Sequence, residues 1–196
     1  MAQAENALDP ARTALLLIDL QPYKLERLPD SDGLLERAAS VIDLARSRSA
    51  HVVHMWTAYS ELDYASVPES NRALLPAIKQ RVLRLEDPAS LIHKAVAPRK
   101  GDLVERKTRV GAFAMTGLDE LLTNLGVIDL VVAGAFTGSA ILSTVRDAAD
   151  RDYRVCVLED CMADPKPEVH DFLLRHILPT QASVIKSVDL DSILGR

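Results

Sequence analysis

Short apolar runs alternate along the chain with longer segments in which apolar residues recur every three or four positions. Six of the short runs have the length of strands, and most of them carry β-branched residues. Two of these runs, at residues 13–20 and 128–134, are almost unbroken apolar stretches, which is typical of strands covered on both faces. We expect strands at residues 13–20, 51–58, 102–107, 128–134, 153–160 and 182–187.

Four segments between these runs have the periodicity of amphipathic helices. Strand and helix alternate, which predicts an α/β fold of three α/β/α layers with a six-stranded parallel sheet in the middle. We find no internal repeat and no linker, so we predict a single domain over residues 1–196. Residues 60–100 are rich in proline and charge, and we expect an irregular insertion there that covers the site. The expected helices span residues 33–48, 116–126, 139–151 and 167–178.

Composition and charge exclude several classes of protein. The chain has 196 residues, of which 48% are hydrophobic, and its net charge of −5 arises from interspersed acidic and basic residues. This pattern predicts a full-sized core and no nucleic-acid or membrane partner. No apolar run approaches the roughly 18–20 residues that span a bilayer, and the N-terminus lacks a basic signal region, so we expect a cytoplasmic protein. Cys156 and Cys161 are too close in sequence for a structural disulfide.

The carboxyl ends of the predicted strands are where ligands bind in such sheets. Asp19 follows an apolar strand, and a buried carboxylate must be paired or have a shifted pKa. Lys107 ends another strand. Each has a simpler interpretation, as a turn residue and a solvated charge respectively. A third strand leads through a Gly/Thr/Ser loop into a helix, a usual place for a nucleophile, yet Ala140 offers only a methyl group there.

Three blocks of sequence together resemble the isochorismatase-like (cysteine hydrolase) family over nearly the whole chain. They are LLLIDLQ, GDLVERKTRVGAFAMTGLDELL and GAFTGSAILSTVRDAADRDYRVCVLEDCMAD, in this order. The resemblance implies a six-stranded parallel sheet and assigns Asp19 and Lys107 to the family's catalytic aspartate and lysine. It also implies that Ala140 falls where the amidase members place their cysteine nucleophile. Without a thiolate, their acyl-enzyme route has no attacking group.

The same resemblance implies a substrate site around the turn before the helix at 139–151. We expect a cis peptide bond between Ala135 and Phe136 that aims backbone N–H groups at a developing anion. The resemblance also implies a homodimer or a larger homo-oligomer, to which Trp56, Tyr59 and Tyr64 add weak support, because aromatic residues are enriched at interfaces. The substrate-binding residues implied are Gln21, Phe113, Ala135, Phe136, Thr137 and Arg109.

No other side chain stands out as a replacement nucleophile, and no metal site is evident. Ser139 is rotated by about 100° from Ala140 on a helix and is expected to point elsewhere. Ser143, one turn on, would more often bond to its own backbone. The nicotinamidase branch of the superfamily has an Asp/His metal cluster, but His51 and His54 are three apart on a strand and face opposite sides. We expect no metal and no other cofactor.

This arrangement is similar to that of true isochorismatases, which keep the aspartate and the lysine and have a small residue in place of the cysteine. They hydrolyse an enol ether, which requires a proton on carbon and a water molecule but no covalent nucleophile. The resemblance therefore implies an isochorismatase-like hydrolase of a small molecule, with Asp19 as general acid and Lys107 orienting it or holding a substrate anion. Burial raises the pKa of such an aspartate and a nearby ammonium lowers it, and the sequence does not decide between them. Two alternatives stay open: an amidohydrolase whose nucleophile is replaced by Ala140, and a catalytically silent binding paralogue.

Overall fold

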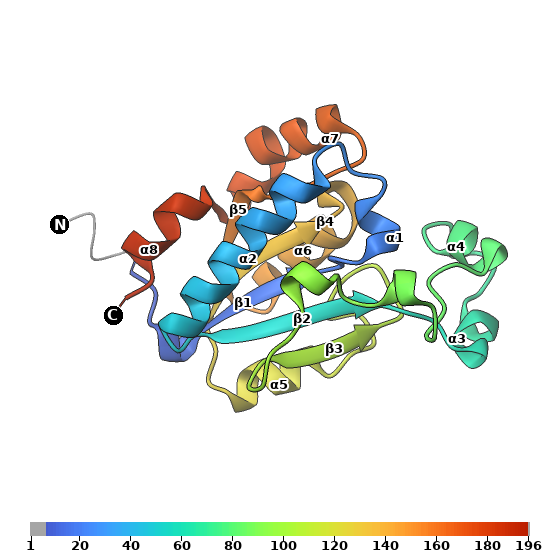
Figure 1. The fold of residues 1–196 in the computed structure, drawn as a ribbon, viewed down its shortest axis with the longest axis horizontal. Helices are drawn as coiled ribbons and strands as arrows, with labels where there is room; N and C mark the ends of the chain where they lie inside the picture. Colours follow the sequence, from blue (N-terminus) through green and yellow to red (C-terminus); the bar gives the residue numbers. More distant parts are fainter. Residues whose placement is uncertain (1–6, 196) are drawn as a thin grey trace.

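A six-stranded parallel sheet forms the middle of the protein. The computed structural model describes residues 7–195, and in it the strands run in the order β3-β2-β1-β4-β5-β6 (Figure 1). Every residue of the two central strands, β1 and β4, is buried, as their apolar runs predicted. The predicted α/β fold with a parallel sheet is thus confirmed. The strands are β1 (Thr13–Ile18), β2 (His51–Thr57), β3 (Leu103–Lys107), β4 (Asp129–Ala135), β5 (Arg154–Ala163) and β6 (Ser183–Ile185).

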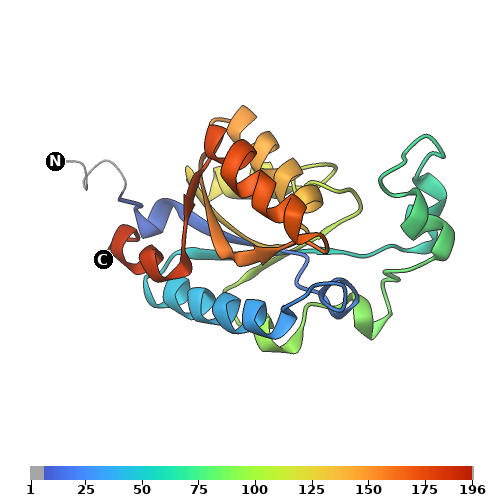
Figure 2. The same cartoon turned by 90° about the horizontal axis from the view of Figure 1, so that it is seen from above.

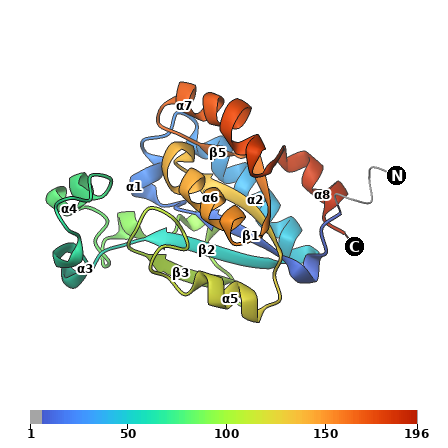
Figure 3. The same ribbon diagram turned by 180° about the vertical axis from the view of Figure 1, so that it is seen from behind.

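Helices cover both faces of this sheet, which gives the three layers expected. One face carries α2 (Ser31–Ser47) and α8 (Leu190–Ile193), and the other face carries α5 (Leu118–Asn124), α6 (Leu142–Asp150) and α7 (Pro167–Phe172) (Figures 2 and 3). Alternating side chains of each strand therefore enter different apolar clusters. Within residues 7–195, no helix combines the length and the apolar character that crossing a membrane requires.

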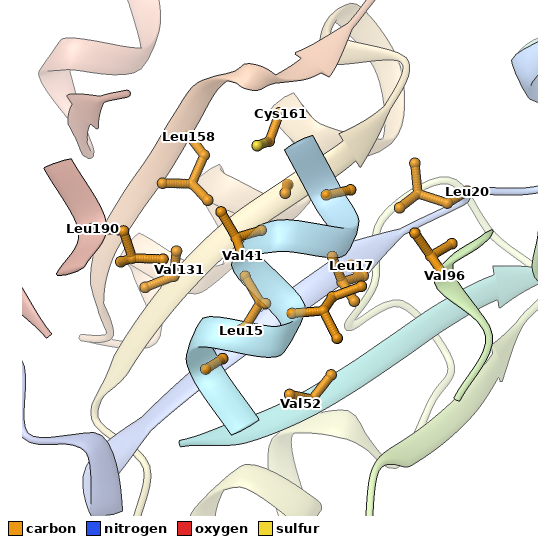
Figure 4. Packing of buried hydrophobic residues seen from close by; sticks show 14 of the residues in the cluster. Leu15, Leu17, Leu20, Val41, Val52, Val96, Val131, Leu158, Cys161 and Leu190 are labelled. Atoms are coloured by element: carbon orange, nitrogen blue, oxygen red, sulfur yellow. The ribbon is translucent and has the colours of Figure 1, made fainter. Parts of the chain in front are cut away.

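Strand β1 illustrates how the two clusters form. Leu15 and Leu17 join the cluster beneath α2 that includes Val41 (Figure 4), whereas Leu16 and Ile18 join the cluster on the opposite face. All five side chains are at most 2% exposed. Burying a side chain of this size stabilises a fold by about 1.5–3 kcal/mol, so the central strands are held firmly from both sides.

Two predicted helices are less regular than their periodicity suggests. The segment 139–151 begins as a π-helical turn over Thr137–Ile141 and becomes α-helical only at α6. The segment 167–178 likewise passes from α7 into a π-helical turn over Leu173–Ile177. A π turn inserts one residue into the usual hydrogen-bond spacing and often occurs at functional sites. Apolar periodicity does not register a single inserted residue, so this feature was missed.

Residues 59–85 form a lobe that projects beyond the carboxyl ends of β1 and β2 (Figure 1). We predicted an irregular segment, but the lobe contains the short helices α3 (Glu61–Ser66) and α4 (Leu75–Gln80). A capping box between Ser60 and Asp63 begins α3, since each side chain bonds to the other's backbone N–H. The sequence pattern did not reveal these helices, because capping rather than apolar periodicity determines a helix of six residues.

The aromatic residues that introduce the lobe are packed inside it. Tyr59 and Tyr64 are 2% and 6% exposed, and their ring centroids lie 5.4 Å apart next to Leu83. Buried rings do not offer a surface to a partner subunit. The homo-oligomer therefore stays a prediction that rests on the family resemblance, without support from these two residues.

The end of β4 approaches β1 unusually closely. Gly134 pairs with Ile18 and has a φ of 138°, and a Cβ atom at this position would lie 2.1 Å from the Ile18 carbonyl oxygen. Only glycine tolerates both this conformation and this approach. As a result, the turn after β4 lies beside the residue that follows β1, which is Asp19.

Candidate active site

Asp19 lies directly after β1, at the carboxyl edge of the sheet. Its backbone has a φ of 60°, in the left-handed region that aspartate tolerates better than most residues. Its N–H donates to the Met55 carbonyl oxygen of β2 at 2.8 Å, and its own carbonyl oxygen accepts from the Gln21 N–H at 2.8 Å. Asp19 is completely buried. The turn thus fixes the carboxylate rigidly inside the protein.

Three side chains surround the Asp19 carboxylate. Lys107, the last residue of β3, places its Nζ 2.9 Å from Oδ2, and the Nζ of Lys24 lies 2.6 Å from the same oxygen. The Thr57 hydroxyl at the end of β2 donates to Oδ1 at 2.7 Å. The predicted Asp19–Lys107 pair is therefore brought together, with β1, β2 and β3 each contributing one residue at its carboxyl end.

Lys24 is the residue of this cluster that the sequence did not predict. It lies on α1 (Pro22–Leu25), a one-turn helix that folds back after Asp19 and buries this lysine. A helix of four residues has no periodicity to detect. The available signal was a proline at the helix start, followed by a lysine five residues after a candidate catalytic aspartate.

The charges shift the pKa values of this cluster. Burial raises the pKa of Asp19, but the ammonium groups of Lys107 and Lys24 outweigh it, so the pKa lies below its usual value and Asp19 is a carboxylate. Burial also lowers the pKa of Lys24 to about 8, against the opposing attraction of Asp19. The structure thus settles the competition that the sequence left open, in favour of an ionised Asp19 in the free protein.

A pocket of about 440 Å³ opens onto this cluster. Its inner wall includes Asp19, Lys24 and Lys107, and the lobe contributes the outer wall with Leu74, Leu83 and other residues of 73–83. The insertion therefore covers the site as predicted. Further lining residues are the cations Arg27 and Arg109, the rings of Tyr23, Tyr59 and Phe136, and the small side chains of Ser139 and Ala140.

The turn between β4 and α6 brings Ala140 to the pocket. Phe136 has a φ of 67°, and the π-helical turn that follows places Ala140 in the wall, where it is 2% exposed. Ser139 also lines the pocket, contrary to our expectation, because the π turn has wider spacing than the α-helix assumed. The expected cis bond at Ala135–Phe136 is wrong: no peptide bond among the described residues is cis, and the left-handed Phe136 turns the chain instead.

Four other residues expected around the substrate are not among the described residues that line this pocket. Gln21 is buried and clamps the Thr57 backbone, donating to its carbonyl oxygen at 2.8 Å and accepting from its N–H at 3.0 Å. Thr137 bonds to His170 at 2.8 Å. The ring of Phe113 stacks on Tyr153, and Ala135 is buried within β4. Gln21 therefore acts on the site through Thr57, whereas Arg109 and Phe136 face the pocket directly.

The two cysteines are remote from this chemistry. Cys156 and Cys161 are free and buried, and burial raises the pKa of each thiol to about 12. A thiol with such a pKa is neither ionised nor reactive near neutral pH. No group of three or more His, Cys, Asp or Glu side chains within residues 7–195 is arranged to hold a metal ion.

The comparison with known families agrees with this geometry. A family model described as "Isochorismatase domain" matches residues 13–189. The chain belongs to the isochorismatase family. Its fold and its named relatives place it among the isochorismatase-like hydrolases.

Individual relatives of this isochorismatase family member span most of its length. A maleamate amidohydrolase from Pseudomonas putida is 31% identical over 183 residues, which cover 91% of this chain and 84% of the relative. A protein named "Probable isochorismatase" from Pseudomonas chlororaphis is 27% identical over 93% of this chain and 86% of its own. Among solved structures, an isochorismatase family protein from Burkholderia thailandensis has a TM-score of 0.81 at 26% identity, covering 96% of this chain and 98% of its own.

Proposed function

We propose that this protein hydrolyses a small anionic enol ether by acid–base chemistry that needs no cysteine. The main support is the buried Asp19 carboxylate, which contacts the ammonium groups of Lys24 and Lys107 on the wall of the pocket. Ala140 lines the same pocket, at the position that the resemblance assigns to the nucleophile of the amidases. The methyl group of Ala140 leaves space for substrate. Asp19 is the group that exchanges the proton, and Lys107 holds it in place.

The charge of the pocket supports an anionic substrate. Apart from Asp19, the charged side chains among residues 7–195 that line it are the cations Lys24, Lys107, Arg27 and Arg109. A substrate carboxylate would pair with cations here, and this pairing would weaken their electrostatic effect on Asp19. The pKa of Asp19 would then rise, so that Asp19 can carry a proton when substrate is bound although it is ionised in the free protein.

The proposed reaction has three steps. Asp19 gives its proton to the terminal vinyl carbon, which leaves an oxocarbenium ion at the ether carbon. Water adds to that carbon and loses a proton to the Asp19 carboxylate. The resulting hemiketal then releases the alcohol and leaves a ketone. No step requires a covalent bond to the protein, so a methyl group at position 140 is no obstacle.

A second candidate is an amidohydrolase whose nucleophile is replaced by Ala140. The observation that favours it is the 31% identity to an enzyme named maleamate amidohydrolase. Against it, no activated thiol lies near the pocket, because both cysteines are buried elsewhere with raised pKa values. A binding paralogue without activity would need neither the ionised Asp19 nor its lysines.

A paired substrate panel tests these candidates. One set holds isochorismate and simple enol ethers, and the other holds maleamate, nicotinamide and carbamoyl compounds. We expect the unmodified protein to release product from the first set only. Amide hydrolysis that appears only in Ala140→Cys, with no turnover of enol ethers, would favour the disabled amidohydrolase. Silence of both proteins on both sets would favour the binding paralogue.

A further inference from the structure

The two lysines that contact Asp19 differ in how many of their ammonium protons already donate hydrogen bonds within the protein. The Nζ of Lys107 lies within hydrogen-bond distance of four acceptors: Asp19 Oδ2 at 2.9 Å, Thr57 Oγ1 at 2.8 Å, the Val110 carbonyl oxygen at 3.1 Å and the Arg109 carbonyl oxygen at 3.3 Å. An ammonium group has only three protons. Lys107 is also 1% exposed, so it has no proton left for a ligand.

Lys24 is less completely satisfied. Among the described residues its hydrogen-bond acceptors are Asp19 Oδ2 at 2.6 Å and Thr57 Oγ1 at 3.2 Å, which leaves one proton of three. The side chain is 10% exposed and lines the pocket, with its Nζ 5.7 Å from the centre of the Phe136 ring. The remaining proton is therefore available to a molecule in the pocket.

We propose that Lys24 is the lysine that contacts the substrate and resupplies Asp19 with its proton, and that Lys107 is a positioning residue. This division of roles rests on the proposed acid–base hydrolysis. It differs from the sequence-based expectation, in which Lys107 was the only lysine of the site and one of its possible roles was to hold a substrate anion.

The proton transfer balances within the cluster. The Lys24 ammonium passes one proton to Asp19 across their 2.6 Å contact, which converts an ion pair into a neutral amine and a neutral carboxylic acid. Asp19 passes that proton to the vinyl carbon. The water that adds to the oxocarbenium ion returns one proton to Asp19, and Asp19 returns it to the Lys24 amine. Overall, one water molecule is consumed and the protein regains its initial state.

The surrounding charges define a pH range for this role. Three charged groups face Lys24: Asp19 at the end of β1, Lys107 at the end of β3 and Arg27 just after α1. Arg109 and Tyr59 line the same pocket. Burial lowers the pKa of Lys24 to about 8, although the attraction of Asp19 opposes this shift, whereas burial raises the pKa of Tyr59 to about 12. Lys24 is thus charged below pH 8 and neutral above it, and proton supply should fail as the pH rises through this value.

Competitive labelling of amines tests the inequality of the lysines without any substrate. The full-length protein is acetylated with trace acetic anhydride at pH 6 to 11, and each lysine is quantified by peptide mass spectrometry, with the exposed Lys100 as internal reference. We expect Lys24 to reach half of its maximal reactivity near pH 8 and Lys107 to react at least tenfold more slowly. Labelling of Lys107 as fast as Lys24, or a midpoint for Lys24 equal to that of Lys100, would overturn the assignment.

Two substitutions at Lys24 test its part in turnover, with isochorismate as the probe. Lys24→Arg keeps a cation that cannot give up its proton, so we expect kcat to fall at least tenfold while KM changes less than threefold. Lys24→Met removes the cation and should also raise KM at least tenfold, and Lys100→Met should match the unmodified protein. A wild-type kcat and pH profile in Lys24→Arg would disprove the role of Lys24. If the unmodified protein does not hydrolyse isochorismate, the proposed function fails on that probe, whereas the labelling result still decides between the two lysines.

Discussion

Asp19 and Asp129 are both completely buried carboxylates, but Asp19 lies just after the carboxyl end of β1, whereas Asp129 is the first residue of the neighbouring strand β4. Asp129 begins β4, and the guanidinium of Arg154 contacts both of its oxygens, at 2.6 Å and 2.8 Å. Asp19 follows the end of β1, and two lysines contact one of its oxygens.

The difference shows that burial alone does not identify a functional carboxylate. An arginine fork fixes both oxygens and keeps its charge at every accessible pH, so the Asp129–Arg154 pair has a structural role. A lysine can give up its proton, and the Lys24 side chain lines a pocket of about 440 Å³. Partner chemistry and access to a cavity distinguish the two sites.

The largest expected effect is the loss of activity in Asp19→Asn, which distinguishes Asp19 from Asp129. Asp19→Asn keeps the shape but can no longer exchange a proton, so we expect kcat/KM for isochorismate to fall by about 10²- to 10⁴-fold. Steady-state kinetics on the purified variant measure this loss, and circular dichroism confirms that the variant is folded. A variant that retains more than half of the activity would remove Asp19 from the mechanism.

A thiol introduced at position 140 tests whether the charges around Asp19 act on a group in the pocket. In Ala140→Cys the new thiol lies beside the lysines, which lower its pKa, so we expect iodoacetamide to alkylate it at pH 7 at least about tenfold faster than Cys156 or Cys161. Peptide mass spectrometry gives the three rates. Equal rates at all three cysteines would mean that the lysines do not act on this position.

Asp129→Asn should affect stability but not catalysis. It weakens a buried charged hydrogen-bond pair, which costs about 1.5–3 kcal/mol of the free energy of unfolding. Urea denaturation measures the loss, and kcat/KM should stay within about twofold of the unmodified protein, a change of under 0.5 kcal/mol in activation free energy. A large loss of activity in the folded variant would contradict the structural role of this pair.

A further prediction concerns the pH dependence of stability. The pKa of Lys24 is lowered on folding from 10.5 to about 8, so between these values the unfolded chain binds a proton that the folded protein lacks. Stability therefore rises with pH across this window. We expect Lys24→Met to lack this rise when both proteins are denatured with urea at pH 8 to 10.5. Parallel curves for the two proteins would contradict the shifted pKa.

Much of the fold follows from the sequence because the central strands have a strong pattern. The unbroken apolar runs at 13–20 and 128–134 predicted strands buried on both faces, and β1 and β4 have that form. Short elements were not predictable in this way. The helices α1, α3 and α4 have four to six residues each, so capping and tertiary packing determine them rather than periodicity.

The part of the candidate site that lies at the strand ends could be predicted from the sequence. Asp19 and Lys107 follow from strand topology, since parallel strands bring their carboxyl ends to one edge. Lys24 depends on a single helical turn, whose one signal in the sequence is the proline at its start, and Ser139 depends on a π turn, which apolar periodicity does not register. Gln21, which the resemblance implied as a substrate-binding residue, instead binds the backbone N–H and carbonyl oxygen of Thr57 with its side-chain amide.

Hydrolysis of isochorismate in deuterium oxide tests the central claim most directly. If a proton from a group that exchanges with solvent is delivered to the vinyl carbon, pyruvate released from the enol ether by the unmodified protein must carry one deuterium in its methyl group at early times. Asp19→Asn must release pyruvate at a rate lowered by about 10²- to 10⁴-fold. Mass spectrometry of the pyruvate reads this directly. Early pyruvate without deuterium, or no pyruvate while Ala140→Cys gains hydrolysis of amides, would contradict acid–base hydrolysis at Asp19.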